Sequence, residues 1–344
     1  MQNPTSAEHA DTATVEGLGE VATLARILPR LPRGDDTLVG PGDDAAIVRA
    51  QDARVVITTD LMVHGPDFRL AWSTFHDLGW KAAASNLADV AAMGAHPTGL
   101  VVGLAVPGDT LVADLEAFAD GLRDAIAVMA PGCGVVGGDM SVSPTLTVAV
   151  TAIGDLEGRD AVLRSGARPG DVVAVSGALG RSGRGLDVLF HLAIDHEGVP
   201  SAGLASELRD RDPDVGWHVA PTPPISDGPL AALAGATAML DLSDGLALDA
   251  GRVARASGVI IDLSATALGI DVRAALAGGE DHSLFATFPA GTALPGGFRS
   301  IGSVRAVAGA EHPGVLLDGG PLDGVLGTTA AGWDPYAGWS GAVG

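Results

Sequence analysis

Short apolar runs that lead directly into aspartate recur along the chain. Three of these runs are residues 55–57, 135–136 and 239–240. The residues of interest after the first run are Thr58, Thr59 and Asp60, those after the second are Gly138 and Asp139, and those after the third are Asp241, Ser243 and Asp244. Runs this short predict strands. A strand end carries its carboxylate to the edge of a sheet, where α/β folds bind ligands. The pattern therefore predicts an α/β fold with carboxylates gathered at sheet edges.

The remaining periodicity divides the chain into two halves. In the first, strands are expected at 45–48, 55–59, 99–106 and 146–153 and helices at 18–31, 72–93 and 111–129, which is an α+β pattern. A Gly-rich stretch at 154–170 precedes strands at 172–176, 259–263 and 283–288 and helices at 186–194, 230–236 and 246–257, with 195–229 irregular. We expect a disordered tail at 1–15, an N-terminal domain at 16–155 and a C-terminal α+β domain at 160–344.

The net charge of the 344-residue chain is −22. Such an acidic protein repels phosphate backbones and anionic lipid, so neither nucleic acid nor a membrane is an expected partner. No apolar run approaches a membrane span, and the N-terminus lacks the apolar core of a signal peptide. These features predict a soluble, cytoplasmic protein. The one cysteine, Cys133, allows no intrachain disulfide.

The charged residues are unevenly chosen. There are 33 Asp against 9 Glu, and 19 Arg against one lysine, Lys81. An excess of Asp favours turns, helix caps and metal loops over solvated helix faces. The lone lysine lies outside any GxxxxGK[ST] segment, which excludes a P-loop nucleotide site. We expect Lys81 to be a solvated helix residue.

The aspartate loops predict phosphate chemistry when they are taken together. Mg²⁺ binds one or two carboxylates and shares phosphate oxygens for its remaining ligands. Several carboxylate loops can therefore hold more than one Mg²⁺ around a polyphosphate, as phosphoryl transfer requires. Each loop alone is better explained as a turn or a helix cap. Their joint occurrence after apolar runs favours the metal interpretation.

The order of these loops matches a known family. The matching segments are GPGDDAAIV (40–48), TTDLMV (58–63), WKAAASNLADVAAMGAHP (80–97), VVGGDM (135–140), LRSGARPGD (163–171), LDLSDGL (240–246), ASGVIIDL (256–263), GGEDHSLF (278–285) and YAGW (336–339). Over residues 16 to 340 the chain resembles thiamine-monophosphate kinase, of the aminoimidazole ribonucleotide synthetase superfamily. The resemblance implies the two-domain α/β fold of that superfamily. Its N-terminal sheet would pair with that of a second copy in a homodimer, and ATP would bind in the cleft between the N-terminal domain and the α+β C-terminal domain.

The resemblance also implies roles for individual residues. Several Mg²⁺ ions would be bound by Asp44, Thr58, Thr59, Asp60, Asp89, Asp139, Asp241 and Asp244, with Asp44, Asp89 and Asp139 catalytic and Asp89 the bridging ligand. ATP would be bound by Gly138, Asp139, Arg164 and Ser243. Thiamine monophosphate would be bound by Asp67, Glu280 and an aromatic residue of the tail, Tyr336 or Trp339. The implied reaction transfers the γ-phosphoryl group of ATP to the substrate phosphate and yields thiamine diphosphate and ADP.

Some positions depart from the family pattern. The histidine that commonly precedes Phe68 is Asp67 here, so either Asp67 or the nearby His64 would take its place. An acid in the family's GDSAAGL turn is Arg181. Three alternatives stay open: a sister enzyme with another small substrate, a non-catalytic Mg²⁺–nucleotide-binding protein, and a metal-dependent phosphohydrolase.

Overall fold

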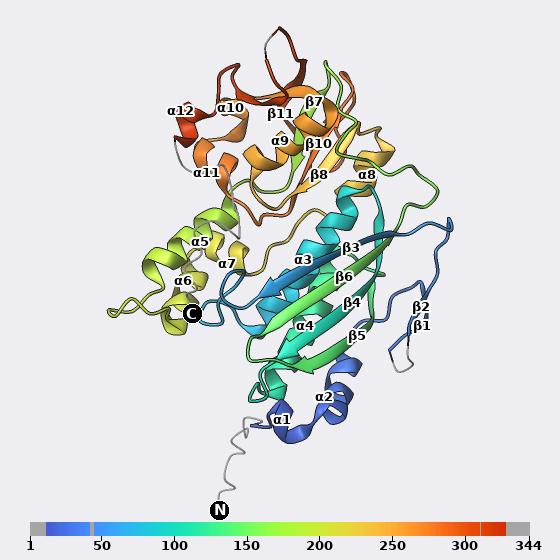
Figure 1. The fold of residues 1–344 in the computed structure, drawn as a ribbon, viewed down its shortest axis with the longest axis vertical. Helices are drawn as coiled ribbons and strands as arrows, with labels where there is room; N and C mark the ends of the chain where they lie inside the picture. The colour runs from blue at the N-terminus through green and yellow to red at the C-terminus, as the bar shows by residue number, and fades with distance from the viewer. Residues whose placement is uncertain (1–11, 42–44, 310, 328–344) are drawn as a thin grey trace, which may run out of the picture.

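The computed structural model describes residues 12–41, 45–309 and 311–327. Its two main sheets, of four and six strands, lie in the lower and upper halves of Figure 1. A two-stranded antiparallel ribbon of β1 (Thr37–Val39) and β2 (Ile47–Val48) stands beside the smaller sheet. The chain passes from the smaller sheet to the larger one between residues 155 and 172. The domain bounds given above stay predictions.

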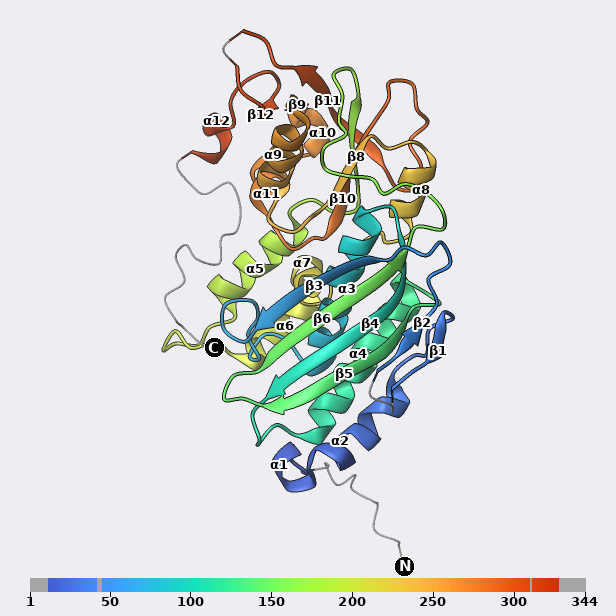
Figure 2. The same cartoon turned by 45° about the vertical axis from the view of Figure 1, so that its right-hand side comes forward.

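The four-stranded sheet is covered by helices on one face. Its strand order is β3 (Val56–Val63), β6 (Thr147–Asp155), β4 (His96–Val106) and β5 (Gly134–Val142), with β4 and β5 parallel and the other pairs antiparallel. The covering helices, α3 (Phe75–Ala92) and α4 (Val112–Met129), lie behind the strands in Figure 2. On the opposite face, called the outer face here, Ile57 and Leu61 are 66% and 61% exposed.

Two glycines let α3 and α4 approach closely. A Cβ atom on Gly79 would lie 2.0 Å from the carbonyl oxygen of Phe118, and one on Gly121 would lie 2.0 Å from that of His76. The backbone of each helix therefore occupies the space that a side chain would need at the glycine of the other helix. The contact fixes α3 against α4 at a distance that no residue with a side chain permits.

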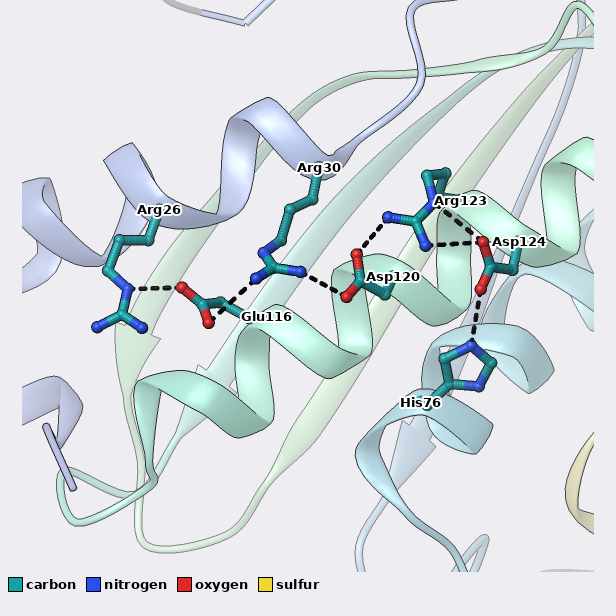
Figure 3. Close-up of polar contacts among 7 residues, drawn as sticks. All are labelled: Arg26, Arg30, His76, Glu116, Asp120, Arg123 and Asp124. Atoms are coloured by element: carbon teal, nitrogen blue, oxygen red, sulfur yellow. Dashed lines mark hydrogen bonds and ion pairs between the residues drawn. The ribbon is translucent and has the colours of Figure 1, made fainter. Parts of the chain in front are cut away.

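Charged side chains tie the N-terminal helices to α4. The single helix expected at 18–31 is instead α1 (Val15–Leu18), α2 (Glu20–Ile27) and the 3-10 helix η1 (Leu28–Arg30), because Gly19 adopts a φ of 81° between α1 and α2. An alternating chain of ion pairs, drawn in Figure 3, runs through Arg26, Glu116, Arg30, Asp120, Arg123 and Asp124, and His76 is hydrogen-bonded to Asp124 at its end. These side chains are partly exposed, so each pair contributes at most about 1 kcal/mol, and the network mainly orients α2.

The six-stranded sheet is covered on both faces. Its order is β12 (Gly314–Leu317), β9 (Val259–Leu263), β11 (Arg299–Ala306), β7 (Val172–Ser176), β10 (Ser283–Phe288) and β8 (Ala238–Leu242), antiparallel except for β12 with β9. One face shares a core with α9 (Leu246–Ser257), α10 (Ala265–Leu268), α11 (Val272–Ala277) and α12 (Asp323–Leu326). Met239, Leu284 and Phe288 on the other face belong to the core around α3. One apolar core therefore connects the two sheets.

Three short helices form a further layer beside loop 64–73. They are α5 (Arg181–Leu192), α6 (Ala202–Arg211) and α7 (Pro213–Val219), which pack around Trp72, Leu189 and Val215. The expectation that 195–229 is irregular is wrong, because α6, α7 and the start of α8 (Asp227–Leu233) lie there. Only one residue of α6 is buried and α7 has seven residues, so neither shows an apolar repeat. None of the helices in the described ranges is long and apolar enough to cross a membrane.

The strands that carry the aspartates are longer than expected. β3 continues through Asp60 to Val63, and β5 continues through Asp139 to Val142, so neither aspartate ends a strand. Because β3 and β5 are opposite edges of the sheet, Asp60 and Asp139 do not lie on neighbouring strands. Asp241 fits the expectation better, since it lies one residue before the end of β8.

Replacing Gly121 with Ala is expected to lower the free energy of unfolding by about 1–3 kcal/mol, because the added methyl group meets a backbone carbonyl. The matched control is Gly216→Ala in α7, where a Cβ meets no atom within 4 Å and helix propensity favours Ala by up to about 1 kcal/mol. Urea unfolding measures both variants. Equal stability of Gly121→Ala and the parent would contradict the close helix contact.

Candidate active site

One face of α3 carries a polar residue at every fourth position. These residues, Asp77, Lys81, Ser85 and Asp89, share a face because four residues make about one helical turn. At 1.5 Å of rise per residue, Lys81 and Asp89 stand about 12 Å apart along the axis. Asp77 closes the N-terminus of α3 in a capping box with Thr74 and pairs with Arg209 of α6. The other three lie along the candidate site.

Carboxylates from three elements gather beside the C-terminal half of α3. Asp89 accepts a hydrogen bond from Thr58 Oγ1 of β3 at 2.8 Å. Burial, together with the charges of Asp241 and Asp60, raises the pKa of Asp89 to about 7. Burial also raises the pKa of Asp60, although the charge of His282 acts in the opposite direction. The structure thus brings Asp60, Asp89 and Asp241 into one electrostatic cluster.

Cationic side chains face Asp241, near the end of β8, and Asp244, just after it. His282 Nδ1 lies 3.3 Å from Asp241 Oδ2. Burial opposes a charge on His282, but its hydrogen bond with Asp241 raises the pKa of the imidazole. Arg252 of α9 pairs with Asp244 at 2.5 Å and also with the buried Asp249. These contacts hold Asp241 and Asp244 in fixed orientations.

Other candidate residues lie away from the cluster. Asp139 is exposed, and the alternation along β5 places it on the outer face, because neighbouring Met140 belongs to the core. Thr59, also on the outer face, donates to the carbonyl of Val150 at 2.9 Å. Gly138 lies beside Asp139 on β5, three strands from β3 in the sheet order.

The remaining residues that were expected to bind ATP or the substrate do not lie together in the described structure. Arg164 is exposed, and its carbonyl accepts a hydrogen bond from Ser257 Oγ at 2.9 Å. Ser243 is half-buried just after β8. Asp44, Tyr336 and Trp339 lie outside the described residues.

The donor set suits Mg²⁺ in its chemistry. Asp60, Asp89, Asp241 and Asp244 offer carboxylate oxygens, which hard divalent cations prefer. Burial and the charges of Asp241 and Asp60 raise the pKa of Asp89, so a cation bound beside Asp89 would stabilise its ionised form. In the part of the chain that the structure describes, however, no three His, Cys, Asp or Glu side chains converge closely enough to hold an ion. Asp241 and Asp244 are paired instead with His282 and Arg252.

A cavity of about 110 Å³ lies beside the N-terminal half of α3. Loop 65–73, α3, α5, α7 and residues 279–280 line it, with Phe68 and Leu186 among the apolar walls. The Arg69 guanidinium stacks on Trp72 and Phe190, 4.5 and 4.8 Å from the ring centres. The cavity is therefore mainly apolar and aromatic, with charged groups at its base.

The two candidates for the substrate-contacting position are placed differently. Asp67 lines the cavity, but its carboxylate accepts the backbone N–H of Val63 at 2.7 Å. The ring of His64 lies against Phe68, with 5.5 Å between the ring centres. The choice between Asp67 and His64 stays a prediction.

Sequence reasoning missed the place of Lys81 at the base of this cavity. Lys81 is 5% exposed and donates from Nζ to Glu280 Oε2 at 2.9 Å, so the expectation of a solvated residue is wrong. Burial alone would raise the pKa of Glu280, but the Lys81 ammonium lowers it to about 2. Burial and then the charge of Lys81 lower the pKa of His218, beside them on α7, to about 3. The available signal was a single lysine directly before the small-residue run at 82–92.

The loop that carries Glu280 has a strained backbone. Glu280 and His282 have φ values of 60° and 51°, which cost residues other than glycine about 1–3 kcal/mol each. Between them, Asp281 accepts two backbone N–H groups at the start of α5, at 2.8 and 3.2 Å. The N–H groups of Glu280 and His282 donate to carbonyls at the end of β8, at 2.7 and 3.0 Å. These anchors direct Glu280 to the cavity and His282 to the carboxylates.

Known proteins with this fold define the class. Residues 42–156 match the family described as AIR synthase related protein, N-terminal domain. The crystal structure of thiamine-monophosphate kinase from Stenotrophomonas maltophilia K279a is 31% identical with a TM-score of 0.70, over 87% of this chain and 95% of that one. Hydrogenase maturation protein HypE in complex with ATP, 21% identical with a TM-score of 0.62 over 86% and 90%, shares the fold alone. The chain therefore has the fold of AIR synthase-related proteins.

Closer relatives define the family. Thiamine-monophosphate kinase of Mycobacterium tuberculosis H37Rv is 42% identical over 344 residues, which cover 96% of this chain and 93% of the relative. The Corynebacterium glutamicum kinase is 40% identical over 311 residues, 86% and 88% of the two chains. AaThiL complexed with AMPPCP and TMP is 32% identical with a TM-score of 0.67, over 90% and 96%. The chain belongs to the thiamine-monophosphate kinase family, which confirms the resemblance of the motifs.

The buried, neutral ring of His218 predicts acid sensitivity. The unfolded chain binds a proton at His218 near pH 6.5 and the folded chain near pH 3, so His218 contributes a loss of up to about 1.4 kcal/mol in the free energy of unfolding per unit of pH decrease below about 6.5. Carboxyl groups with raised pKa, such as Asp89, contribute with the opposite sign in the parent and the variant alike, so His218→Gln is expected to differ from the parent by the His218 contribution between pH 6.5 and 5. Urea unfolding at each pH measures it, with exposed His191→Gln as the control. A parent-like slope in His218→Gln would contradict the assignment.

Proposed function

We propose that this chain transfers the γ-phosphoryl group of ATP to thiamine monophosphate and releases thiamine diphosphate and ADP. The observation that carries the proposal is 42% identity to the Mycobacterium tuberculosis kinase over 96% of the chain. A solved relative with both AMPPCP and TMP supports it. The arrangement along α3 agrees, because carboxylates for metal-bound phosphates and a cavity for a ring lie on one helix face.

The acceptor explains why no general base is needed. A phosphate oxygen is already anionic near neutral pH, so catalysis requires positioning and charge neutralisation. Bound Mg²⁺ would supply that neutralisation between two groups of the same charge. We assign Asp60, Asp89, Asp241 and Asp244 to hold it, with Asp44, Thr58, Thr59 and Asp139 as further ligands.

Several side chains orient this set. Thr58 fixes Asp89 through its hydroxyl, and Arg252 and His282 orient Asp244 and Asp241. Contacts of ATP with Gly138, Arg164 and Ser243, and of the substrate with Tyr336 or Trp339, stay predictions. So does the cytoplasmic location.

Thiamine diphosphate should form when the chain is incubated with MgATP and thiamine monophosphate, as chromatography would detect. Asp89→Asn is expected to lower kcat by about 100-fold or more without unfolding the chain, because it removes one charge from the central carboxylate. Asp187→Asn, on the exposed side of α5, is the control and should keep the parent rate. A parent-like kcat for Asp89→Asn at saturating Mg²⁺ would remove Asp89 from the site. Phosphate release without thiamine monophosphate would instead indicate a phosphohydrolase.

A homodimer completes the proposal. The outer face of the four-stranded sheet presents Ile57 and Leu61 without a covering layer in the described ranges, and an apolar sheet face is stable when a second layer packs on it. We propose that two copies pack through their outer faces. Asp139 lies on this face and away from Asp60, so in the proposed dimer it would lie at the interface.

Leu61→Arg is expected to convert the dimer into a monomer, because the interface would bury an unpaired charge. Light scattering after gel filtration measures the mass. Val128→Arg on α4 is the matched control, since Val128 is also 61% exposed but lies away from the outer face. A parent of monomer mass, or an unchanged dimer in Leu61→Arg, would contradict the interface.

A further inference from the structure

The chain uses arginine for all its basic residues except one, and the exception is buried. Lys81 is 5% exposed at the base of the cavity, whereas the arginines in ion pairs are 18% or more exposed. A buried charge destabilises a fold unless a partner compensates it. Glu280 is that partner, at 2.9 Å. An ammonium suits the position because it is a compact point charge, whereas a guanidinium is a wide planar fork.

The two members of this pair are exposed to different degrees. Both side chains line the cavity, but Glu280 is 32% exposed and Lys81 only 5%. A molecule in the cavity would therefore meet mainly the carboxylate. Lys81 can influence such a molecule through the charge and the direction of Glu280.

The other groups around Glu280 do not replace this cation. His218 of α7 has its Nδ1 3.6 Å from Glu280 Oε2, but its lowered pKa leaves the ring neutral. The charge of Asp67, on loop 64–73, is repelled by that of Glu280. His282, two residues further along, is turned to Asp241. Lys81 is thus the cation that holds this carboxylate ionised.

We propose that Lys81 is a positioning residue for the substrate: its ammonium keeps Glu280 ionised and directed into the cavity, where the carboxylate binds the cationic, amine-bearing ring portion of thiamine monophosphate. The inference rests on the proposed function. The distance of about 12 Å along α3 from Lys81 to Asp89 places the ring portion and the phosphate at two ends of one helix face. Lys81 does not touch the reacting atoms.

A positioning role predicts a particular kinetic pattern. Lys81→Met should raise KM for thiamine monophosphate about 10-fold or more, the effect of losing a charge-assisted hydrogen bond. Its kcat should stay within about threefold, and KM for ATP should not change, because the lost interaction concerns ring binding. Between pH 7 and 5, KM of Lys81→Met should rise as the pH falls, because Glu280 becomes protonated without the ammonium. The ratio of this KM to that of the parent should rise with it, because the substrate phosphate and Asp89 titrate alike in both proteins, whereas Lys81→Arg should keep a constant ratio to the parent.

The control breaks an ion pair on the same helix face. Arg209→Met removes the partner of Asp77 one helical turn from Lys81 and outside the cavity, so it should lower stability and leave KM unchanged. An equal rise of KM in Arg209→Met, or a Lys81→Met KM within twofold of the parent, overturns the proposal. If Lys81→Met fails to fold, the Lys81→Met/Glu280→Gln double variant removes both charges and should fold. Its KM should equal that of Glu280→Gln, and a further rise overturns the proposal.

Failure of the proposed function gives a different result. A parent that forms no thiamine diphosphate refutes the kinase activity but still permits a binding test. Calorimetry with thiamine monophosphate and no nucleotide then decides. Weaker binding to Lys81→Met than to the parent and Arg209→Met supports the positioning role, and equal or absent binding overturns it.

Discussion

Helix α3 is the element on which both halves of the molecule depend. Of its 18 residues, 14 are buried, and its surroundings are α4, the four-stranded sheet and the inner face of the six-stranded sheet. A helix that is apolar on nearly all sides is stable only at the centre of a protein. Its one polar face consequently lies where the two sheets meet, and the spacing of that face sets the spacing of the candidate site.

The charges on this face are compensated unequally. Asp77 has Arg209, and Lys81 has Glu280. Asp89 accepts a hydrogen bond from the hydroxyl of Thr58, but burial and two neighbouring carboxylates raise its pKa to about 7. A protein interior tolerates an uncompensated carboxylate cluster at a cost in stability. The cluster is thus the one place on this face where a bound cation would lower the electrostatic energy.

The sequence predicted the family and the α/β class, because motif order and apolar patterning are properties of the chain itself. The resemblance implied one metal set that includes Asp60, Asp89 and Asp241, and the structure brings these carboxylates into one electrostatic cluster. The sequence did not predict the length of β5. Gly138 suggests a turn in the sequence, yet it lies inside the strand, where a Cβ would be 2.1 Å from the carbonyl oxygen of Val102. Nor did it predict the burial of Lys81, since that depends on the distant Glu280 loop.

The loop at 278–282 makes the two ends of the site interdependent. Glu280 and His282 hold their strained backbone because Asp281 is bonded to the start of α5 and the loop is bonded to the end of β8. Glu280 faces the cavity and His282 faces Asp241, so a molecule that fixes one side chain restricts the other. A ring bound in the cavity would therefore help to set the direction of a carboxylate at the other end of α3. If the ring portion of the substrate binds at Glu280, its recognition and the placement of the phosphate would be coupled through the five residues 278–282.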